Sequence, residues 1–128
     1  MRLRTPLAKA KGLGSAKHGT HHFWMQRVTA IALVPLTFWF VTSLVAMVSV
    51  DHDTVSTWLS TPLTAILMLL FIIALFYHAQ LGMQVVIEDY VESEWQKLAN
   101  IILVKLLAFI AATASVFAVL RVFLAGTA

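Results

Sequence analysis

The longest uncharged segment limits what this chain can fold into more than any other feature. Residues 54–87 form a run of 34 residues without one Asp, Glu, Lys or Arg, and the run ends abruptly at Glu88. About 20 apolar residues are enough for a helix to cross the hydrocarbon core of a bilayer, so this segment can span a membrane. His78 lies inside it. Because an ionisable side chain at membrane depth costs free energy unless something satisfies it, His78 is the first candidate for a functional site.

The composition of the whole chain also indicates an integral membrane protein. Of its 128 residues, 60% are hydrophobic and 12% are charged, whereas a soluble domain carries about 25% charged residues. The absence of cysteine excludes disulfides, cysteine-ligated iron–sulfur clusters and covalently attached haem. The length predicts a single domain.

Three apolar segments predict an all-α fold with three transmembrane helices. They cover residues 28–50, 62–87 and 101–124. Backbone groups inside lipid must be satisfied within their own segment, which a helix achieves. Short connections are expected at residues 51–61 and 88–100. Pro35 falls inside the first segment and predicts a kink or a local repair by neighbouring groups.

The basic residues predict the orientation of the chain. Six of the nine precede residue 28, and no acidic residue does: Arg2, Arg4, Lys9, Lys11, Lys17 and Arg27. Because Lys and Arg are retained on the cytoplasmic side of a membrane, residues 1–27 are expected to form a basic cytoplasmic arm. Residues 28–128 then form the three-helix transmembrane anchor, whose C-terminus lies on the periplasmic side.

His78 lies on one stripe of the predicted second helix. At about 100° per residue, this stripe also holds Phe71, Ala74, Gly82, Val85 and Asp89. Small residues one turn either side of His78 open a shallow groove, which suits close helix packing or a flat macrocycle. A neutral imidazole near mid-membrane can bind a metal through one nitrogen and donate a hydrogen bond through the other. The alternative is that His78 only hydrogen-bonds a neighbouring helix.

Two segments carry motifs of a known family. Residues 78–90 read His-Ala-Gln-Leu-Gly-Met-Gln-Val-Val-Ile-Glu-Asp-Tyr, which resembles the His-x(10)-Asp-Tyr pattern of the smaller hydrophobic membrane-anchor subunit of bacterial succinate dehydrogenase. Residues 14–30 resemble the family segment that leads into the first span, with its Arg-x-Thr-Ala sequence starting at Arg27. The Gly-Ser-Ala-Lys stretch that begins at residue 14 is most similar to the alphaproteobacterial branch.

The resemblance implies a cofactor and a set of site residues. His78 would be an axial ligand of haem b, and Arg27 would pair with a haem propionate, with His21 near the same propionates. Tyr90 would hydrogen-bond a ubiquinone carbonyl, and Asp89 would help to order that site. Without the resemblance, Tyr90 could be an interfacial aromatic, Arg27 a topology-setting charge and His21 an interfacial polar residue.

The resemblance also implies partners and a location. The chain would be half of a two-subunit helical bundle in the bacterial inner membrane, where the second anchor protein of the complex, a cytochrome b, supplies the other haem ligand. The flavoprotein and iron–sulfur subunits would oxidise succinate, because this chain has no flavin-binding fingerprint and is not catalytic alone. The expected function is that of an anchor in succinate:ubiquinone oxidoreductase, respiratory complex II. The alternatives are an anchor of a quinol:fumarate reductase and a small His-dependent membrane transporter.

Overall fold

The described part of the chain is built from helices, which confirms the predicted all-α transmembrane class. The computed structural model describes Leu7, Ala10 and residues 17–126, with the backbone alone at Lys17 and His18. Within these residues it contains no strand. The four consecutive helices are α2 (Lys17–Ala46), α3 (His52–Leu59), α4 (Pro62–Tyr90) and α5 (Glu94–Gly126).

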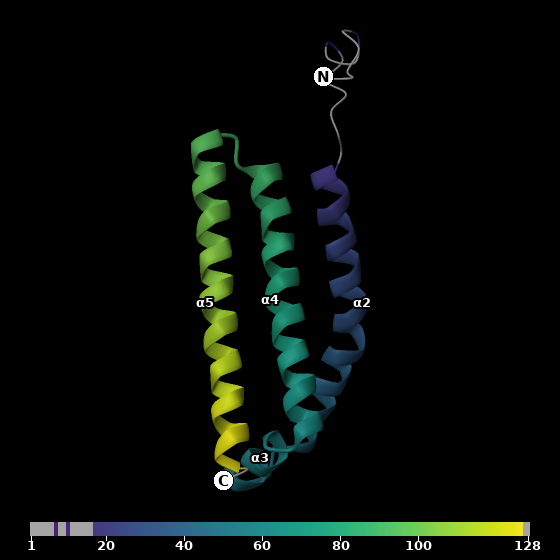
Figure 1. The fold of residues 1–128 in the computed structure, drawn as a ribbon, viewed down its shortest axis with the longest axis vertical. Helices are drawn as coiled ribbons and strands as arrows, with labels where there is room; N and C mark the ends of the chain where they lie inside the picture. The colour runs from purple at the N-terminus through teal and green to yellow at the C-terminus, as the bar shows by residue number, and fades with distance from the viewer. Residues whose placement is uncertain (1–6, 8–9, 11–16, 127–128) are drawn as a thin grey trace, which may run out of the picture.

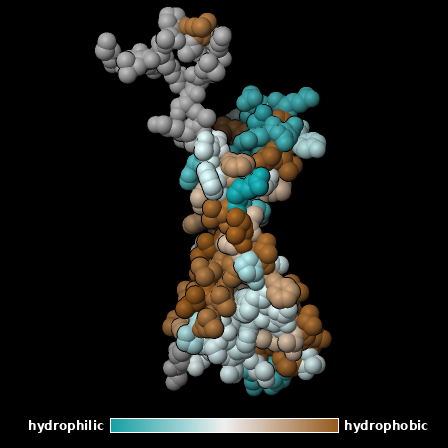
Figure 2. Space-filling model, turned by 90° about the vertical axis from the view of Figure 1, so that its right-hand side faces the viewer, coloured by the Kyte–Doolittle hydropathy of each residue, from teal (hydrophilic) through white to brown (hydrophobic). Residues whose placement is uncertain are grey.

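Three of these helices are long and apolar enough to cross a membrane. They are the segment Gly19–Ala46 of α2, the whole of α4 and the whole of α5. At about 1.5 Å per residue, each exceeds a hydrocarbon core of about 30 Å. In the view of Figure 2, hydrophobic surface covers much of the middle of the molecule and hydrophilic surface gathers near its two ends.

The helices are longer than the predicted spans. α2 begins at Lys17, eleven residues before the apolar segment, and α5 begins at Glu94 rather than near residue 101. The connection between α4 and α5 therefore consists of residues 91–93, and is shorter than the predicted connection at residues 88–100. Hydropathy marks only the part of a helix that lies in lipid, whereas backbone hydrogen bonding continues through the polar residues on either side of it.

α4 is the central helix of the bundle. Figure 1 shows α5, α4 and α2 side by side, and α4 packs against both of the others. Ala65 and Ile72 of α4 form a buried cluster with Val119 of α5. On the other side, the rings of Phe71 and Phe40 stack with centroids 4.7 Å apart and so join α4 to α2. Every residue of these clusters was predicted to lie in a membrane span.

Pro35 lies inside α2 without ending it. A proline within a helix removes one backbone hydrogen bond and clashes with the preceding turn, which bends the helix. Figure 1 shows α2 bent, with its second half slanting towards the end of α4 next to α3. The expected kink is therefore present.

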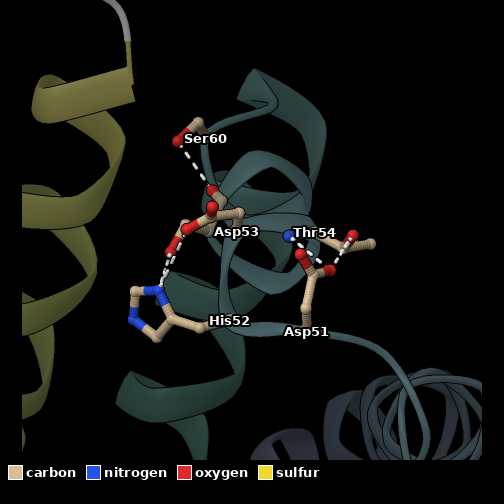
Figure 3. A network of polar contacts seen from close by, with 6 residues as sticks. Asp51, His52, Asp53, Thr54 and Ser60 are labelled. Atoms are coloured by element: carbon tan, nitrogen blue, oxygen red, sulfur yellow. Dashed lines mark hydrogen bonds and ion pairs between the residues drawn. The ribbon is translucent and has the colours of Figure 1, made fainter.

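α3 is an eight-residue helix in a segment that was predicted to be only a short connection. Val55, Trp58 and Leu59 are half-buried, and this i, i+3, i+4 spacing is typical of an amphipathic helix. Trp58 stacks on Trp39 of α2 with ring centroids 5.8 Å apart. The polar side of α3 carries the contacts in Figure 3, where His52 Nδ1 lies 3.6 Å from Asp53 Oδ1.

Asp51 fixes the first turn of α3. Its Oδ1 accepts a hydrogen bond from the Thr54 N–H at 3.3 Å and another from the Thr54 hydroxyl. The hydroxyl bond, followed by the N–H bond, lowers the pKa of Asp51 below its ordinary value. A carboxylate whose pKa is lowered by folding stabilises the folded state above its ordinary pKa, and this contribution disappears as the pH falls through the lowered pKa.

We expect Asp51→Ala to increase hydrogen exchange at the amides of α3 at neutral pH, because the N-cap bond is lost. The matched variant Asp51→Asn retains a capping oxygen, so it should keep wild-type protection at neutral pH. Wild-type protection should fall once the pH drops below the ordinary pKa of an aspartate, about 3.9, whereas Asp51→Asn should not respond there. Hydrogen exchange measured by mass spectrometry tests this, and equal protection in Asp51→Ala and wild type would contradict it.

Candidate functional site

The site begins with a contact between α2 and α4. Thr29 of α2 is buried, and its Oγ1 lies 3.0 Å from Nδ1 of His78 on α4. The same hydroxyl lies 2.7 Å from the carbonyl oxygen of Met25 and 3.1 Å from that of Gln26, both on α2. The structure thus satisfies one nitrogen of the imidazole with a side chain that the sequence analysis did not single out.

The Thr29 contact links the tautomer of His78 to the direction of the threonine hydroxyl. A threonine hydroxyl has one hydrogen to donate and two lone pairs that accept. When the hydroxyl donates its hydrogen to the Met25 carbonyl, the contact nearest to it at 2.7 Å, it accepts the bond from Nδ1–H of His78. In that arrangement Nε2 carries the free lone pair. Holding one nitrogen in this way is how proteins orient a histidine that binds a metal through the other.

An apolar groove of about 600 Å³ lies beside His78. Its lining comes almost entirely from α2, and neither Ala74 nor Gly82 is part of it. A Cβ on Gly82 would meet Gln26 Nε2 at 3.9 Å, an ordinary contact. Besides His78, the lining residues are Ala30, Leu33, Val34, Thr37, Phe38 and Val41. His78 is the one ionisable side chain of this lining, and the other lining residues are mostly apolar. The groove therefore presents an imidazole to any ligand that occupies it.

Arg27 lies on the same stripe of α2 as this groove. Counting about 100° per residue, Ala30, Val34, Phe38 and Val41 all fall within about 60° of Arg27. Arg27 is exposed, and its guanidinium carbon lies 5.0 Å from the centroid of the Phe23 ring. It stands about 4.5 Å beyond Ala30 towards the N-terminal end of α2. The stripe therefore places a cation beyond one end of an apolar groove.

Asp89 and Tyr90 are the last two residues of α4. Both are exposed, and Tyr90 has 82% of its surface accessible. Tyr90 is twelve residues from His78, or about 18 Å along the helix. Eleven residues separate Asp89 from His78, so Asp89 lies on the same side of α4 to within about 20°. In this chain the two residues are presented at a helix end and are not enclosed.

The structure does not bring His21 together with Arg27 and His78. His21 lines a different pocket, of about 480 Å³, together with His22, Tyr77 and Lys105. Six residues separate His21 from Arg27, which turns the two side chains about 120° apart on a helix. The side chain of His18 lies outside the described part of the chain. Thus Arg27 shares a stripe with the groove beside His78, and His21 belongs to another surface.

Among the residues that the structure describes, no three His, Cys, Asp or Glu side chains gather where they could hold a bare metal ion. A metal bound at His78 would therefore need its remaining ligands from outside these residues. A porphyrin supplies four nitrogen ligands of its own, so a single histidine suits haem iron better than it suits a bare ion.

Comparison with known proteins identifies the family. Residues 1–112 match the family described as the succinate dehydrogenase/fumarate reductase transmembrane subunit. The chain belongs to this family. The match includes Arg27, Thr29, His78 and Tyr90, and it confirms the resemblance that the two motifs predicted.

Several relatives from alphaproteobacteria support the assignment. The protein from Rickettsia bellii is 40% identical over 91% of this chain and 93% of its own length. The protein from Rickettsia conorii is 37% identical, over 90% and 92% of the two chains. The protein from Paracoccus denitrificans is 32% identical, over 94% and 93%. Each of the three is a succinate dehydrogenase hydrophobic membrane anchor subunit.

We expect Thr29→Val to release the imidazole of His78. Valine has nearly the shape of threonine but no hydroxyl, so Nδ1–H loses its acceptor, and an unsatisfied buried donor costs about 1–3 kcal/mol. Thr29→Ser keeps the hydroxyl and serves as the control. The ¹⁵N chemical shifts of the His78 ring should report a protonated Nδ1 in wild type and Thr29→Ser, and a mixture of tautomers in Thr29→Val. Identical shifts in all three proteins would show that Thr29 does not set the tautomer.

Proposed function

We propose that this chain is the membrane-anchor subunit of succinate:ubiquinone oxidoreductase, respiratory complex II, and that it contributes an axial ligand of haem b and part of the ubiquinone-reduction site. The observation that carries the haem assignment is the bond between Thr29 and Nδ1 of His78, 3.0 Å long. It leaves Nε2 free for iron on a side chain that lines an apolar groove.

The residues at the groove fit a haem. A porphyrin ring is flat and apolar, and its two propionates are anionic, so it needs an apolar wall and a cation near one edge. The α2 side of the groove supplies the wall, and Arg27 lies beyond its end on the same stripe. When bound, haem b supplies a one-electron carrier. Thr29 orients the ligand, the apolar side chains of α2 keep water from the ring, and Arg27 balances propionate charge.

A second axial ligand would come from another chain, because His78 is the one histidine in the lining of this groove. The second anchor protein of the complex, a cytochrome b, is the proposed source. Ile31, Val34 and Phe38 of α2 are each more than 70% exposed, which is a large apolar surface next to the groove. Packing of a partner helix on this surface would complete a two-subunit bundle with the haem inside it.

Asp89 and Tyr90 are suited to the quinone. A ubiquinone carbonyl that is being reduced needs a hydrogen-bond donor and a source of protons, and a phenol and a carboxylate at the end of a span offer both. In this chain the two residues are exposed, so other subunits would supply the remaining walls of the pocket. His21 stays a weaker proposal for the haem propionates, because it lines a different pocket.

The names of the relatives support the remaining partners and the location. The relatives are named as hydrophobic membrane anchor subunits of succinate dehydrogenase, and we propose that this chain anchors a flavoprotein and an iron–sulfur subunit in the bacterial inner membrane. The basic residues before residue 28 support a cytoplasmic N-terminus and a periplasmic C-terminus.

The family description also covers fumarate reductase, so an anchor of a quinol:fumarate reductase is the second candidate. The relatives from Rickettsia and Paracoccus favour succinate oxidation, because they are succinate dehydrogenase subunits. Family membership argues against the small membrane transporter.

We expect His78→Ala to remove or alter the haem of the purified complex, because the groove offers no other ligand. The reduced-minus-oxidised spectrum of the b-type haem measures this. His52→Ala is the matched control, since His52 lies in α3 at the other end of the bundle, and its spectrum should equal that of wild type. An unchanged low-spin spectrum in His78→Ala would overturn the ligand assignment but would leave the anchor function standing.

We expect Tyr90→Phe to lower ubiquinone reduction several-fold to about tenfold, because a lost hydrogen bond to a neutral group costs about 0.5–1.5 kcal/mol. The ring is retained, so packing at the membrane interface is nearly conserved. Succinate oxidation with an artificial acceptor should stay at the wild-type rate and serves as the control. Wild-type ubiquinone turnover in Tyr90→Phe would identify Tyr90 as an interfacial aromatic.

A further inference from the structure

A second polar stripe runs along α4 away from His78. It consists of Tyr77, Gln80, Gln84 and Glu88, at i, i+3, i+7 and i+11. At about 100° per residue, its mean direction is more than 100° from that of His78 and Asp89. The four side chains line the pocket of about 480 Å³, together with His21 and His22 of α2 and Lys105 of α5.

Polar groups in this pocket lack partners among the described residues. His22 Nε2 is buried and has no hydrogen-bond partner there. Lys105, which lies in a predicted membrane span, forms no ion pair within the described residues. Glu88 has one bond, in which its Oε1 accepts from Gln84 Nε2 at 2.7 Å. Because a buried polar group without a partner costs free energy, such a pocket is suited to a polar ligand.

An apolar groove of about 500 Å³ adjoins this polar pocket. It lies between α4 and α5, and both cavities share Tyr77, Gln80 and Lys105. The other lining residues are mostly apolar: Ile73, Phe76, Ala108, Phe109, Ala112, Thr113 and Val116. From mid-membrane outwards the combined site therefore offers an apolar groove, then the cation Lys105, and then the anion Glu88, about 12 Å beyond Gln80 along α4.

The side chains of both charged residues lean into the pocket. A helical side chain points back towards the N-terminus of its own helix. α4 and α5 run in opposite directions (Figure 1), so Lys105 leans outwards and Glu88 leans inwards. The bond from Gln84 to Glu88 agrees with this direction, because Gln84 is one turn deeper.

We propose that this site binds one phospholipid with a phosphoethanolamine headgroup. An acyl chain would occupy the apolar groove past Tyr77 and Gln80, the phosphate would accept a hydrogen bond from the outward-leaning Lys105, and the outer ammonium would donate to the inward-leaning Glu88. The order of charges in the site matches the order in this lipid, in which the phosphate is next to the acyl chains and the amine is outermost. An anionic lipid would place a negative charge next to Glu88, which is unfavourable. A quinone carries no charge that could pair with Lys105 or Glu88.

The proposal is independent of the assignments of His78, Arg27, Asp89 and Tyr90, because it uses another side of α4 and none of these residues lines its pocket. Its test uses the purified complex that contains this chain, stripped of loosely bound lipid in mild detergent. Phosphatidylethanolamine, phosphatidylcholine and phosphatidylglycerol with the same acyl chains are then added, and retained lipid is measured by native mass spectrometry. Wild type should retain phosphatidylethanolamine most tightly, because choline has no N–H to donate and glycerol has no positive charge.

We expect Lys105→Met to weaken phosphatidylethanolamine binding about tenfold, because a charge-assisted hydrogen bond is lost. Lys105→Arg keeps the charge and should restore binding, which separates loss of the site from misfolding. Glu88→Gln should bind phosphatidylethanolamine and phosphatidylglycerol about equally, so the preference for phosphatidylethanolamine should be lost. Arg121→Met is the control, because it removes a cation near the other end of α5. This variant should bind the lipid as tightly as wild type does.

Three results would overturn the proposal. Equal or tighter retention of phosphatidylglycerol by wild type would identify an anionic-lipid site. Displacement of the bound lipid by ubiquinone would identify a quinone site. Unchanged retention in both Lys105→Met and Glu88→Gln would show that the lipid binds elsewhere.

Discussion

The hydrogen bond between Thr29 and His78 is the contact on which the rest of the site depends. It joins α2 to α4 inside the membrane-spanning part of the bundle, where a free imidazole N–H would be costly. The same contact favours one tautomer, because a hydroxyl that donates to the Met25 carbonyl can only accept from Nδ1–H. One contact therefore joins two helices and orients the imidazole that we propose as a haem ligand. The two functions proposed for His78 from the sequence, helix packing and metal binding, do not exclude each other.

The central position of α4 explains why one helix can serve two separate sites. Its His78 side meets α2 and the groove proposed for haem, and its Tyr77 side faces α5 and the pocket proposed for lipid. Three helices side by side bury few side chains, so much apolar surface stays exposed on α2 and α5. In a soluble protein such a surface would promote aggregation. In a membrane anchor it is the surface that meets lipid and partner helices.

The sequence predicted the features that depend on hydropathy and on residue type. The three spans and the position of His78 inside the second of them followed from uncharged runs, and the family followed from two motifs. The helix ends did not follow, because hydropathy does not record where hydrogen bonding stops outside lipid. α3 was missed, although Val55, Trp58 and Leu59 carry its amphipathic spacing, because the segment was treated only as a connection. The position of His21 and the partner of His78 depend on how α2 is rotated against α4, which the sequence alone does not determine.

The central claim is that Thr29 holds His78 so that Nε2 can bind iron. A structure of the complete complex purified from membranes, determined by electron cryomicroscopy at a resolution that shows axial ligands, tests it most directly. The account predicts haem iron bound to Nε2 of His78, with Nδ1 still hydrogen-bonded to Thr29 and the ring against the α2 groove. Iron bound through Nδ1, or a haem that His78 does not ligate, would contradict it.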